Sequence, residues 1–173
     1  MDRAARAGAR TMLIVVDLDL FKTANDSRGH QFGDAVLRFF ASRLRESVRD
    51  DDVVARVGGD EFLVAMVAPE DPKPLVERIY SFITCAYEGF PISASMGIAL
   101  SEGEPASMEP SFETRTAAYD ELFGRADVAL YEMKKAGRGG YAFASKASSA
   151  IRSHEERTAL SAIDGPRTAA EGK

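Results

Sequence analysis

Apolar positions in the first part of the chain follow the spacing of a buried strand and then of a helix. Residues 11–17 form a β-branched apolar run that ends in Asp17, a composition typical of a strand buried on both faces. From Phe32 onward, apolar side chains recur at helical spacing, which predicts an amphipathic helix packed on a sheet. These side chains are Phe32, Val36, Phe39, Phe40, Leu44 and Val48.

The middle of the chain has the pattern of a hairpin. Two apolar segments, residues 53–57 and 62–67, are joined by the sequence GGDE at residues 58–61. Glycine readily adopts the positive φ that tight hairpin turns require, so we expect the two glycines to form the turn in that conformation. The turn would place Asp60 and Glu61 at the edge of a strand.

Further helices and strands are predicted downstream. The prolines at 72 and 74 favour a helix that begins there, and residues 92–100 predict a strand. Residues 101–119 are polar without periodicity and are interpreted as a long loop. A third helix is expected to end near Gly137, followed by a strand at residues 141–144. The second helix should bury Leu75, Ile79, Phe82, Ile83 and Ala86, and the third Leu122, Ala126, Ala129, Leu130 and Met133.

This order of elements predicts the fold class. Strand, helix, strand, strand, helix and strand form an α+β sandwich with a ferredoxin-like βαββαβ core, to which the last helix and strand are added. We expect the folded domain to span residues 1–145. Residues 146–173 are rich in Ala, Ser, Arg, Glu and Thr, which predicts a flexible polar tail.

Composition limits the classes of function. The 173 residues include 22 Lys and Arg against 27 Asp and Glu, a net charge of -5, which argues against bulk nucleic-acid binding. Cys85 is the only cysteine, so no intrachain disulfide forms and a reducing cytoplasm is expected. The apolar run of residues 12–16 is far too short to cross a membrane, and no membrane contact is expected.

Acidic side chains are expected to meet where the first strand ends. If that strand and the hairpin are neighbours in the sheet, Asp17 and Asp60 approach each other across one edge. Mg²⁺ takes oxygen ligands and usually binds through one or two carboxylates plus substrate phosphates. Asp17 and Asp60, with Glu61 beside them, fit that pattern. A single acidic residue in such a place is more often a solvated surface group, so the clustering carries the hypothesis.

Five sequence blocks occur in an order that resembles the GGDEF-domain diguanylate cyclases. The resemblance covers residues 11–143. The blocks are DLDLFKTAND at residues 17–26, GHQFGD at 29–34, RVGGDEF at 56–62, SMGIA at 95–99 and ADVALY at 126–131, followed by Lys134 and Gly137-Arg138.

The resemblance implies a reaction and a metal. Members of this family condense two GTP molecules into cyclic di-GMP and release two pyrophosphates, on a fold similar to nucleotidyl cyclase and polymerase palm domains. By resemblance, Asp17 and Asp60 hold Mg²⁺, or Mn²⁺ in its place, with help from the Leu18 carbonyl. Glu61 would orient or deprotonate the attacking 3′-hydroxyl.

The resemblance also implies a GTP site. Asn25 and Asp34 correspond to the pair that reads guanine, whose N1 and N2 donors match carboxylate and amide acceptors. Lys134 and Arg138 correspond to the phosphate-binding pair, although a helix-end lysine also has a simpler role as a complement to the helix dipole. Phe21 and Lys22 are expected along the triphosphate. Gly58 and Gly59 would let a phosphate approach the backbone.

The resemblance implies regulation and assembly. Arg49 and Asp52 match the RxxD site at which cyclic di-GMP inhibits the family; a charged connector is the plain alternative. Catalysis would need a homodimer, each domain presenting one GTP, and an upstream sensor domain is expected in the full-length protein. The N-terminal cap segment of the family is short or missing before residue 11. The isolated chain is therefore expected to be largely monomeric and weakly active.

Two other functions are weighed against the cyclase. In the first, the chain is a catalytically weak module that binds GTP or cyclic di-GMP as a regulatory domain; the intact Asp17, Asp60 and Glu61 argue against it. In the second, it is an RNA-recognition domain, a fold that shares this order of elements. Residues 138–143 faintly resemble the RNP1 motif of such domains. That segment falls on the last strand, and the net charge is negative.

Overall fold

A central five-stranded sheet organises the chain. The structure is a computed structural model that describes residues 9–102 and 112–145. Strand β1 (Thr11–Leu18) lies in the middle and pairs antiparallel with β3 (Glu61–Val67) and with β6 (Ala94–Leu100). At one edge β2 (Val53–Arg56) pairs antiparallel with β3, and at the other β7 (Gly140–Phe143) pairs parallel with β6.

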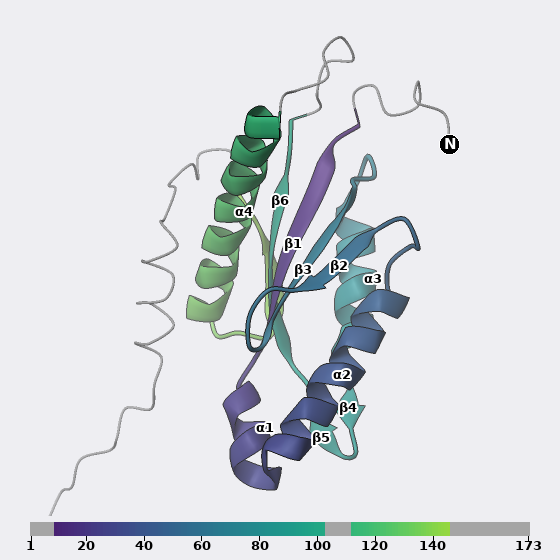
Figure 1. The fold of residues 1–173 in the computed structure, drawn as a ribbon, viewed down its shortest axis with the longest axis vertical. Coiled ribbons are helices and arrows are strands. Elements are labelled where there is room, and N and C mark those ends of the chain that lie inside the picture. The colour runs from purple at the N-terminus through teal and green to yellow at the C-terminus, as the bar shows by residue number, and fades with distance from the viewer. Residues whose placement is uncertain (1–8, 103–111, 146–173) are drawn as a thin grey trace, which may run out of the picture.

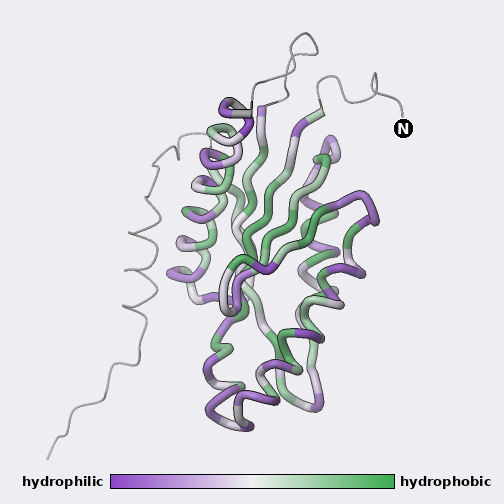
Figure 2. Tube along the Cα trace, viewed as in Figure 1, coloured by the Kyte–Doolittle hydropathy of each residue, from purple (hydrophilic) through white to green (hydrophobic). Residues whose placement is uncertain are grey.

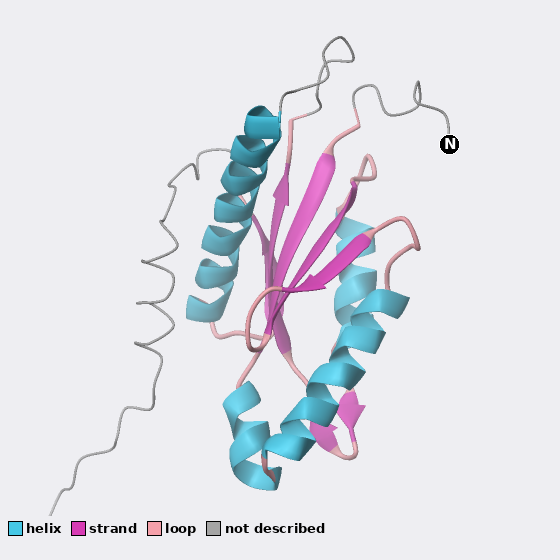
Figure 3. Cartoon of the chain, in the orientation of Figure 1, coloured by secondary structure: helices cyan, strands magenta, loops and turns pink. Residues whose placement is uncertain are grey.

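Helices cover both faces of this sheet. The helices α2 (His30–Glu46) and α3 (Lys73–Ile83) lie on one face, and α4 (Phe112–Lys135) lies on the other (Figure 1). The short helix α1 (Phe21–Arg28) follows β1 beyond the end of the sheet (Figure 3). The order β2-β3-β1-β6 is that of a ferredoxin-like core, so the predicted α+β fold is confirmed, with α4 and β7 as its extension.

Alternation along β1 divides the core into two layers. Met12, Ile14 and Val16 pack in the cluster that contains residues of α2 and α3, whereas Leu13 and Val15 pack with α4. All five side chains are buried, as the sequence pattern predicted for a central strand. Figure 2 shows the corresponding hydrophobic colour along the strands and hydrophilic colour at the loops.

Several sequence predictions are wrong in detail. Helix α1 was not expected, because its residues are polar and only Ala24 is buried. The residues from 112 to 119, predicted as loop, begin α4; residues 103–111 of that loop and the tail 146–173 lie outside the described residues. Strand β6 begins at Ala94, two residues after the predicted start.

Helix α3, the second helix predicted from the sequence, ends earlier than predicted. Ala86 does not extend α3, which stops at Ile83 because Thr84 takes an extended backbone. Ala86 is exposed and belongs to a small hairpin of β4 (Ala86–Tyr87) and β5 (Phe90–Pro91). Glu88 and Gly89 both have positive φ, as a tight two-residue hairpin turn requires.

None of the helices that the structure describes is long and apolar enough to span a membrane. This finding covers residues 9–102 and 112–145 only. The expectation that the apolar run at the start of the chain is a strand is confirmed by β1.

Gly97 on β6 sets the distance between the sheet and α4. A Cβ added there would overlap the carbonyl oxygen of Ala126 and the backbone nitrogen of Leu130. Gly97→Ala should therefore lower the free energy of unfolding by about 3 kcal/mol, because helix backbone cannot yield as a side chain can. Urea unfolding followed by circular dichroism measures this change.

Gly124→Ala is the matched control for this prediction. Gly124 lies within α4, and a Cβ added there meets no atom within 4 Å. Alanine has the higher helix propensity, so this variant should gain up to about 1 kcal/mol. Equal stabilities for the two variants would show that α4 does not pack closely on β6.

Candidate active site

The acidic residues predicted to meet are brought to one end of the sheet. Asp17 and Glu61 are directly opposed in the pairing of β1 with β3. The amide of Leu18 donates a hydrogen bond to the carbonyl of Asp60 at 3.2 Å. The β1–α1 connection, the β2–β3 turn and the end of α4 all lie at this end (Figure 1).

Asp17 is a buried carboxylate with a cationic partner. Its residue is 7% exposed, and its Oδ2 lies 2.8 Å from Nζ of Lys134 on α4. Burial raises the pKa of Asp17 from 3.8 to about 6; the Lys134 ammonium opposes this rise, and the charges of Asp60 and Glu61 add to it. Negative charge is therefore concentrated here beyond what one ammonium neutralises.

The side chains near Asp17 could hold a metal ion only together with ligands from water or phosphate. Within the described ranges, no group of three or more His, Cys, Asp or Glu side chains is arranged to hold a metal ion. Mg²⁺ commonly uses one or two carboxylates and takes its other ligands from water and phosphate. The crowded charges around Asp17, already drawn to an ammonium, fit a cation site of that kind.

The turn between β2 and β3 is held by an arginine that the sequence analysis did not single out. The Arg56 guanidinium donates to the carbonyl oxygens of Gly58 and Gly59, the shortest contact being 2.6 Å to Gly59. Arg56 thus fixes the backbone that presents Asp60 and Glu61. A pattern of hydrophobic and polar positions contains no signal for such a contact.

The two glycines of the turn do not adopt the predicted backbone conformation. Neither has positive φ, so the expectation of that conformation is wrong. A Cβ at Gly58 would lie 2.8 Å from Oε2 of Glu61, so the glutamate side chain folds over this glycine. A Cβ at Gly59 meets nothing within 4 Å, which leaves the space beside that backbone open.

The residues assigned to guanine lie on two neighbouring helices, Asn25 on α1 and Asp34 on α2. A Cβ on Gly33 would overlap Oδ1 of Asn25 and come within 3.2 Å of the Phe21 ring, so Gly33 makes room for both side chains. Asp34 follows on α2 and lines a cavity of about 250 Å³. The other lining residues are Leu37, Arg38, Ala41, Val54, Ala55, Arg56 and Phe62.

The residues assigned to the triphosphate come from the start of α1, from the end of α4 and from the loop after α4. Lys22 is exposed in the first turn of α1, after Leu20, whose backbone is left-handed with φ 56°. Lys134 contacts Asp17, and Arg138 follows the end of α4 with φ 63°. Large side chains seldom adopt this conformation, and such strain is often found at functional sites.

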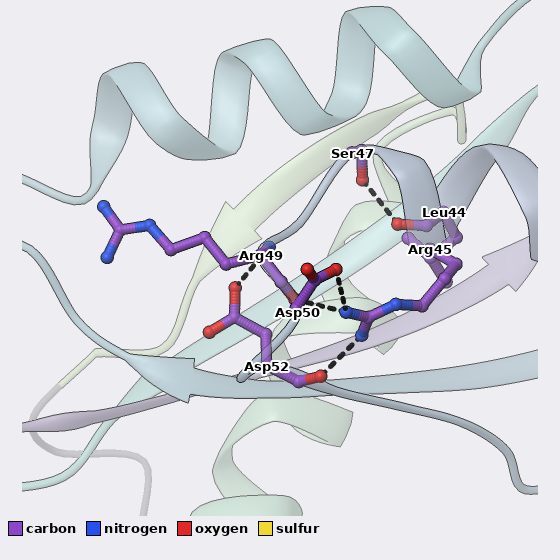
Figure 4. A network of polar contacts seen from close by, with 6 residues as sticks. All are labelled: Leu44, Arg45, Ser47, Arg49, Asp50 and Asp52. Carbon is purple, nitrogen blue, oxygen red and sulfur yellow. Dashed lines mark hydrogen bonds and ion pairs between the residues drawn. The ribbon is translucent and has the colours of Figure 1, made fainter. Parts of the chain in front are cut away.

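The Arg49-Asp52 pair forms a compact turn between α2 and β2 (Figure 4). The backbone amide of Arg49 donates to Oδ2 of Asp52 at 2.8 Å. The guanidinium of Arg45 donates to the carbonyl oxygens of Asp52 and Arg49 and lies 3.6 Å from Oδ1 of Asp50. The Arg49 guanidinium points away from this network in Figure 4. Sequence reasoning did not identify Arg45 as the residue that fixes the turn.

Comparison with known proteins assigns the family. The sequence model described as "Diguanylate cyclase, GGDEF domain" matches residues 1–140. The bifunctional diguanylate cyclase/cyclic di-GMP phosphodiesterase MucR of Pseudomonas aeruginosa is 39% identical over 83% of this chain and 20% of its own length. Diguanylate cyclase DgcS of Shewanella oneidensis is 37% identical, over 80% of this chain and 44% of its own. The chain belongs to the GGDEF diguanylate cyclase family.

Solved structures agree with this assignment. An EAL/GGDEF domain protein from M. capsulatus is 35% identical with a TM-score of 0.65, covering 83% of this chain and 91% of that one. The GGDEF domain of DgcB from Caulobacter crescentus, solved with c-di-GMP, is 27% identical with a TM-score of 0.61, covering 82% and 84%. The chain spans less than half the length of the curated relatives described above.

The raised pKa of Asp17 predicts a pH-dependent stability difference. Because this pKa lies above the ordinary value, the folded state binds the proton more tightly. The contribution of Asp17 to stability therefore falls as the pH rises from about 4 to about 6 and is constant above that range. Asp17→Asn removes the buried charge. At pH 7 this variant should be about 2 to 3 kcal/mol more stable than the wild type, whereas near pH 3.5 the two should be equal.

Denaturant unfolding at the two pH values measures this difference. Asp51→Asn is the control, because Asp51 is exposed and its replacement should leave the stability unchanged at both. If Asp17→Asn were less stable than the wild type at pH 7, the Lys134 pair would outweigh the cost of burial, contrary to the direction of the pKa shift.

Proposed function

We propose that this chain is a diguanylate cyclase that condenses two GTP molecules into cyclic di-GMP and two pyrophosphates. The observation that carries the proposal is the register that opposes Asp17 and Glu61, with Asp60 in the adjoining turn, in a chain of this family. Each 3′-hydroxyl attacks the α-phosphorus of the other GTP. In each attack an oxygen–phosphorus bond forms, the bond to pyrophosphate breaks, and the hydroxyl proton passes to a base.

Glu61 is the proposed base. Its side chain lies over Gly58 in the turn and is half-buried, so part of it is accessible to a ligand. Asp17 and Asp60 would hold Mg²⁺ together with the Leu18 carbonyl. When bound, the ion would offset the negative charge that develops on the phosphoryl and leaving oxygens.

The proposed role of Lys134 follows from its pairing with Asp17. An ammonium 2.8 Å from Oδ2 of Asp17 pairs with a carboxylate that would also hold the metal. We propose that Lys134 turns from Asp17 to a phosphate of GTP when the metal–nucleotide complex binds. Arg138, one turn further along the chain, would contact the same triphosphate.

Specificity for guanine would come from Asn25 and Asp34. Gly33 brings the Asn25 amide close to α2, and Asp34 borders the cavity of about 250 Å³. Guanine offers N–H donors to these acceptors, whereas adenine would leave them unpaired, which costs binding energy. The Phe21 ring lies with Asn25 beside Gly33.

Catalysis would require two copies, because one domain presents one set of these residues and the reaction joins two nucleotides. We propose a homodimer that works in the cytoplasm, where GTP is available, and that a further domain of a longer protein brings the two copies together. Among the structural neighbours, SiaD of P. aeruginosa was solved with its activator SiaC.

Substitution of the acidic residues tests the reaction. In a leucine-zipper fusion supplied with GTP and Mg²⁺, Glu61→Gln and Asp60→Asn should each lower cyclic di-GMP formation at least 100-fold, because a base or a metal ligand is lost. Chromatography of the products measures the rate. Glu70→Gln is the matched control, since Glu70 is exposed beyond the opposite end of β3.

The outcomes separate the candidate functions. Activity that survives both substitutions would eliminate the proposed mechanism. A wild-type fusion that binds GTP or cyclic di-GMP and makes no product would be a regulatory module instead.

Product inhibition is proposed at the turn drawn in Figure 4. Arg49→Ala should raise the concentration of cyclic di-GMP needed for half-inhibition at least tenfold while the uninhibited rate stays the same, because Arg49 lies outside the active site. Asp52→Ala should act similarly and also loosen the turn, since Asp52 accepts a hydrogen bond from the Arg49 amide. Initial rates at increasing product concentrations measure this.

Arg78→Ala serves as the control for charge alone, because Arg78 is exposed on α3. Unchanged inhibition in Arg49→Ala would mean that the Arg49-Asp52 turn is only a charged connector.

A further inference from the structure

The Asp19 carboxylate joins three segments that are distant in sequence. Oδ1 accepts a hydrogen bond from the Ser95 hydroxyl at 2.7 Å. Oδ2 accepts one from the Ser93 hydroxyl at 2.8 Å and one from the backbone amide of Gly139 at 3.0 Å. The Asp19 amide in turn donates to the Ser93 carbonyl at 2.9 Å. Asp19 therefore ties the end of β1 to the start of β6 and to the loop that follows α4.

The tied loop has an unusual backbone. Gly137, Arg138 and Gly139 have φ values of 124°, 63° and 64°, so three successive residues are in a region that side chains rarely adopt. A Cβ at Gly139 would contact the Ser93 hydroxyl at 3.4 Å. A loop of this shape needs external contacts to persist, and the bond from its Gly139 amide to a carboxylate is one that a charged acceptor makes strong.

The hydrogen-bond partners of Asp19 include residues close to Asp17 in the sheet. Ser95 is opposite Asp17 in the pairing of β1 with β6, and Gly140 is opposite Ser95 in the pairing of β6 with β7. Asp19 thus binds the residue beside Asp17 and the residue before Gly140. The loop with Arg138 is set, through these bonds, at a fixed place relative to the buried Asp17 carboxylate.

We propose that Asp19 is a positioning residue that holds the loop 137–139, and with it Arg138, at the place where a triphosphate bound at Asp17 meets the guanidinium. This inference rests on the proposed function. It concerns the phosphate end of the nucleotide alone, because none of the contacts of Asp19 reaches Asn25 or Asp34.

Asp19→Asn tests the proposal with three measurements on the full chain. Hydrogen exchange of the Gly139 amide, followed by NMR without nucleotide, should become at least tenfold faster, because the amide loses its charged acceptor. Calorimetry with Mg²⁺ should show about tenfold weaker binding of a non-hydrolysable GTP analogue and unchanged binding of GMP, which lacks the outer phosphates. Asp120→Asn, an exposed aspartate on α4, should change none of these.

A double-mutant cycle shows whether Asp19 acts through Arg138. If it does, Asp19→Asn combined with Arg138→Ala should bind the GTP analogue no more weakly than Arg138→Ala alone. Independent losses that multiply would overturn the positioning role. Should Asp19→Asn not fold, the double variant Ser93→Ala/Ser95→Ala removes two of the three donors and should show a smaller loss with the same difference between the GTP analogue and GMP.

The measurements distinguish this proposal from the one on which it rests. If the wild type binds the GTP analogue and Asp19→Asn binds it equally well, positioning by Asp19 is wrong and the cyclase proposal stands. If GTP and GMP binding fall together, Asp19 supports the fold alone. If the wild type binds neither nucleotide, the cyclase proposal fails and positioning fails with it, whatever the exchange of the Gly139 amide shows.

Discussion

The antiparallel register between β1 and β3 is the constraint on which the candidate site depends. It opposes Asp17 to Glu61 and places the Asp60 carbonyl against the Leu18 amide. A shift by one residue would turn every side chain of β1 to the other face of the sheet. Asp17 continues the series of Leu13 and Val15, which faces α4, and for this reason it meets Lys134. The hydrophobic pattern that specifies the strand also determines where its terminal carboxylate points.

Burying the Asp17 carboxylate costs free energy, and the contact with Lys134 offsets this cost only in part. Burial and two neighbouring carboxylates raise the pKa of Asp17, and Lys134 alone opposes them. Backbone strain occurs at the same end: of the described non-glycine residues with positive φ, Leu20 follows β1 and Arg138 follows α4, while Glu88 is in the turn of the β4–β5 hairpin. Charge and strain that do not stabilise the fold are typical of a site that is completed by a ligand.

The sequence predicts those parts of the structure that depend on periodicity. Strand β1, the β2–β3 hairpin, α2 and the packed part of α4 each have the spacing of a buried face, and each is found. Helix α1 has no such face, since Ala24 alone is buried, and the first turns of α4 are exposed. Gly58 was assigned to the turn correctly, but the positive φ expected of it is not found.

Contacts between residues distant in sequence leave no periodic pattern from which they could be predicted. Asp19 reaches partners 74, 76 and 120 positions away, and nothing in the spacing of Ser93, Ser95 and Gly139 indicates that they share one acceptor. Arg45 and Arg56 bind backbone carbonyl oxygens, which every residue possesses. The acidic residues could be identified because their motif is distinctive, whereas the residues that hold the surrounding loops in place are evident only in the folded structure.

The ferredoxin-like core and its extension supply groups of opposite charge to the candidate site. The ferredoxin-like core supplies the carboxylates of Asp17, Asp60 and Glu61, which by themselves would repel a triphosphate. The cations Lys134 and Arg138 come from α4 and from the loop before β7, the elements added to that core. β7 pairs parallel with β6, so the chain must cross the sheet face through α4 before it returns, and this crossing delivers Lys134 to Asp17. The hydrogen bond from the Gly139 amide to Asp19 joins the two contributions, because it ties the loop that carries Arg138 to the end of β1.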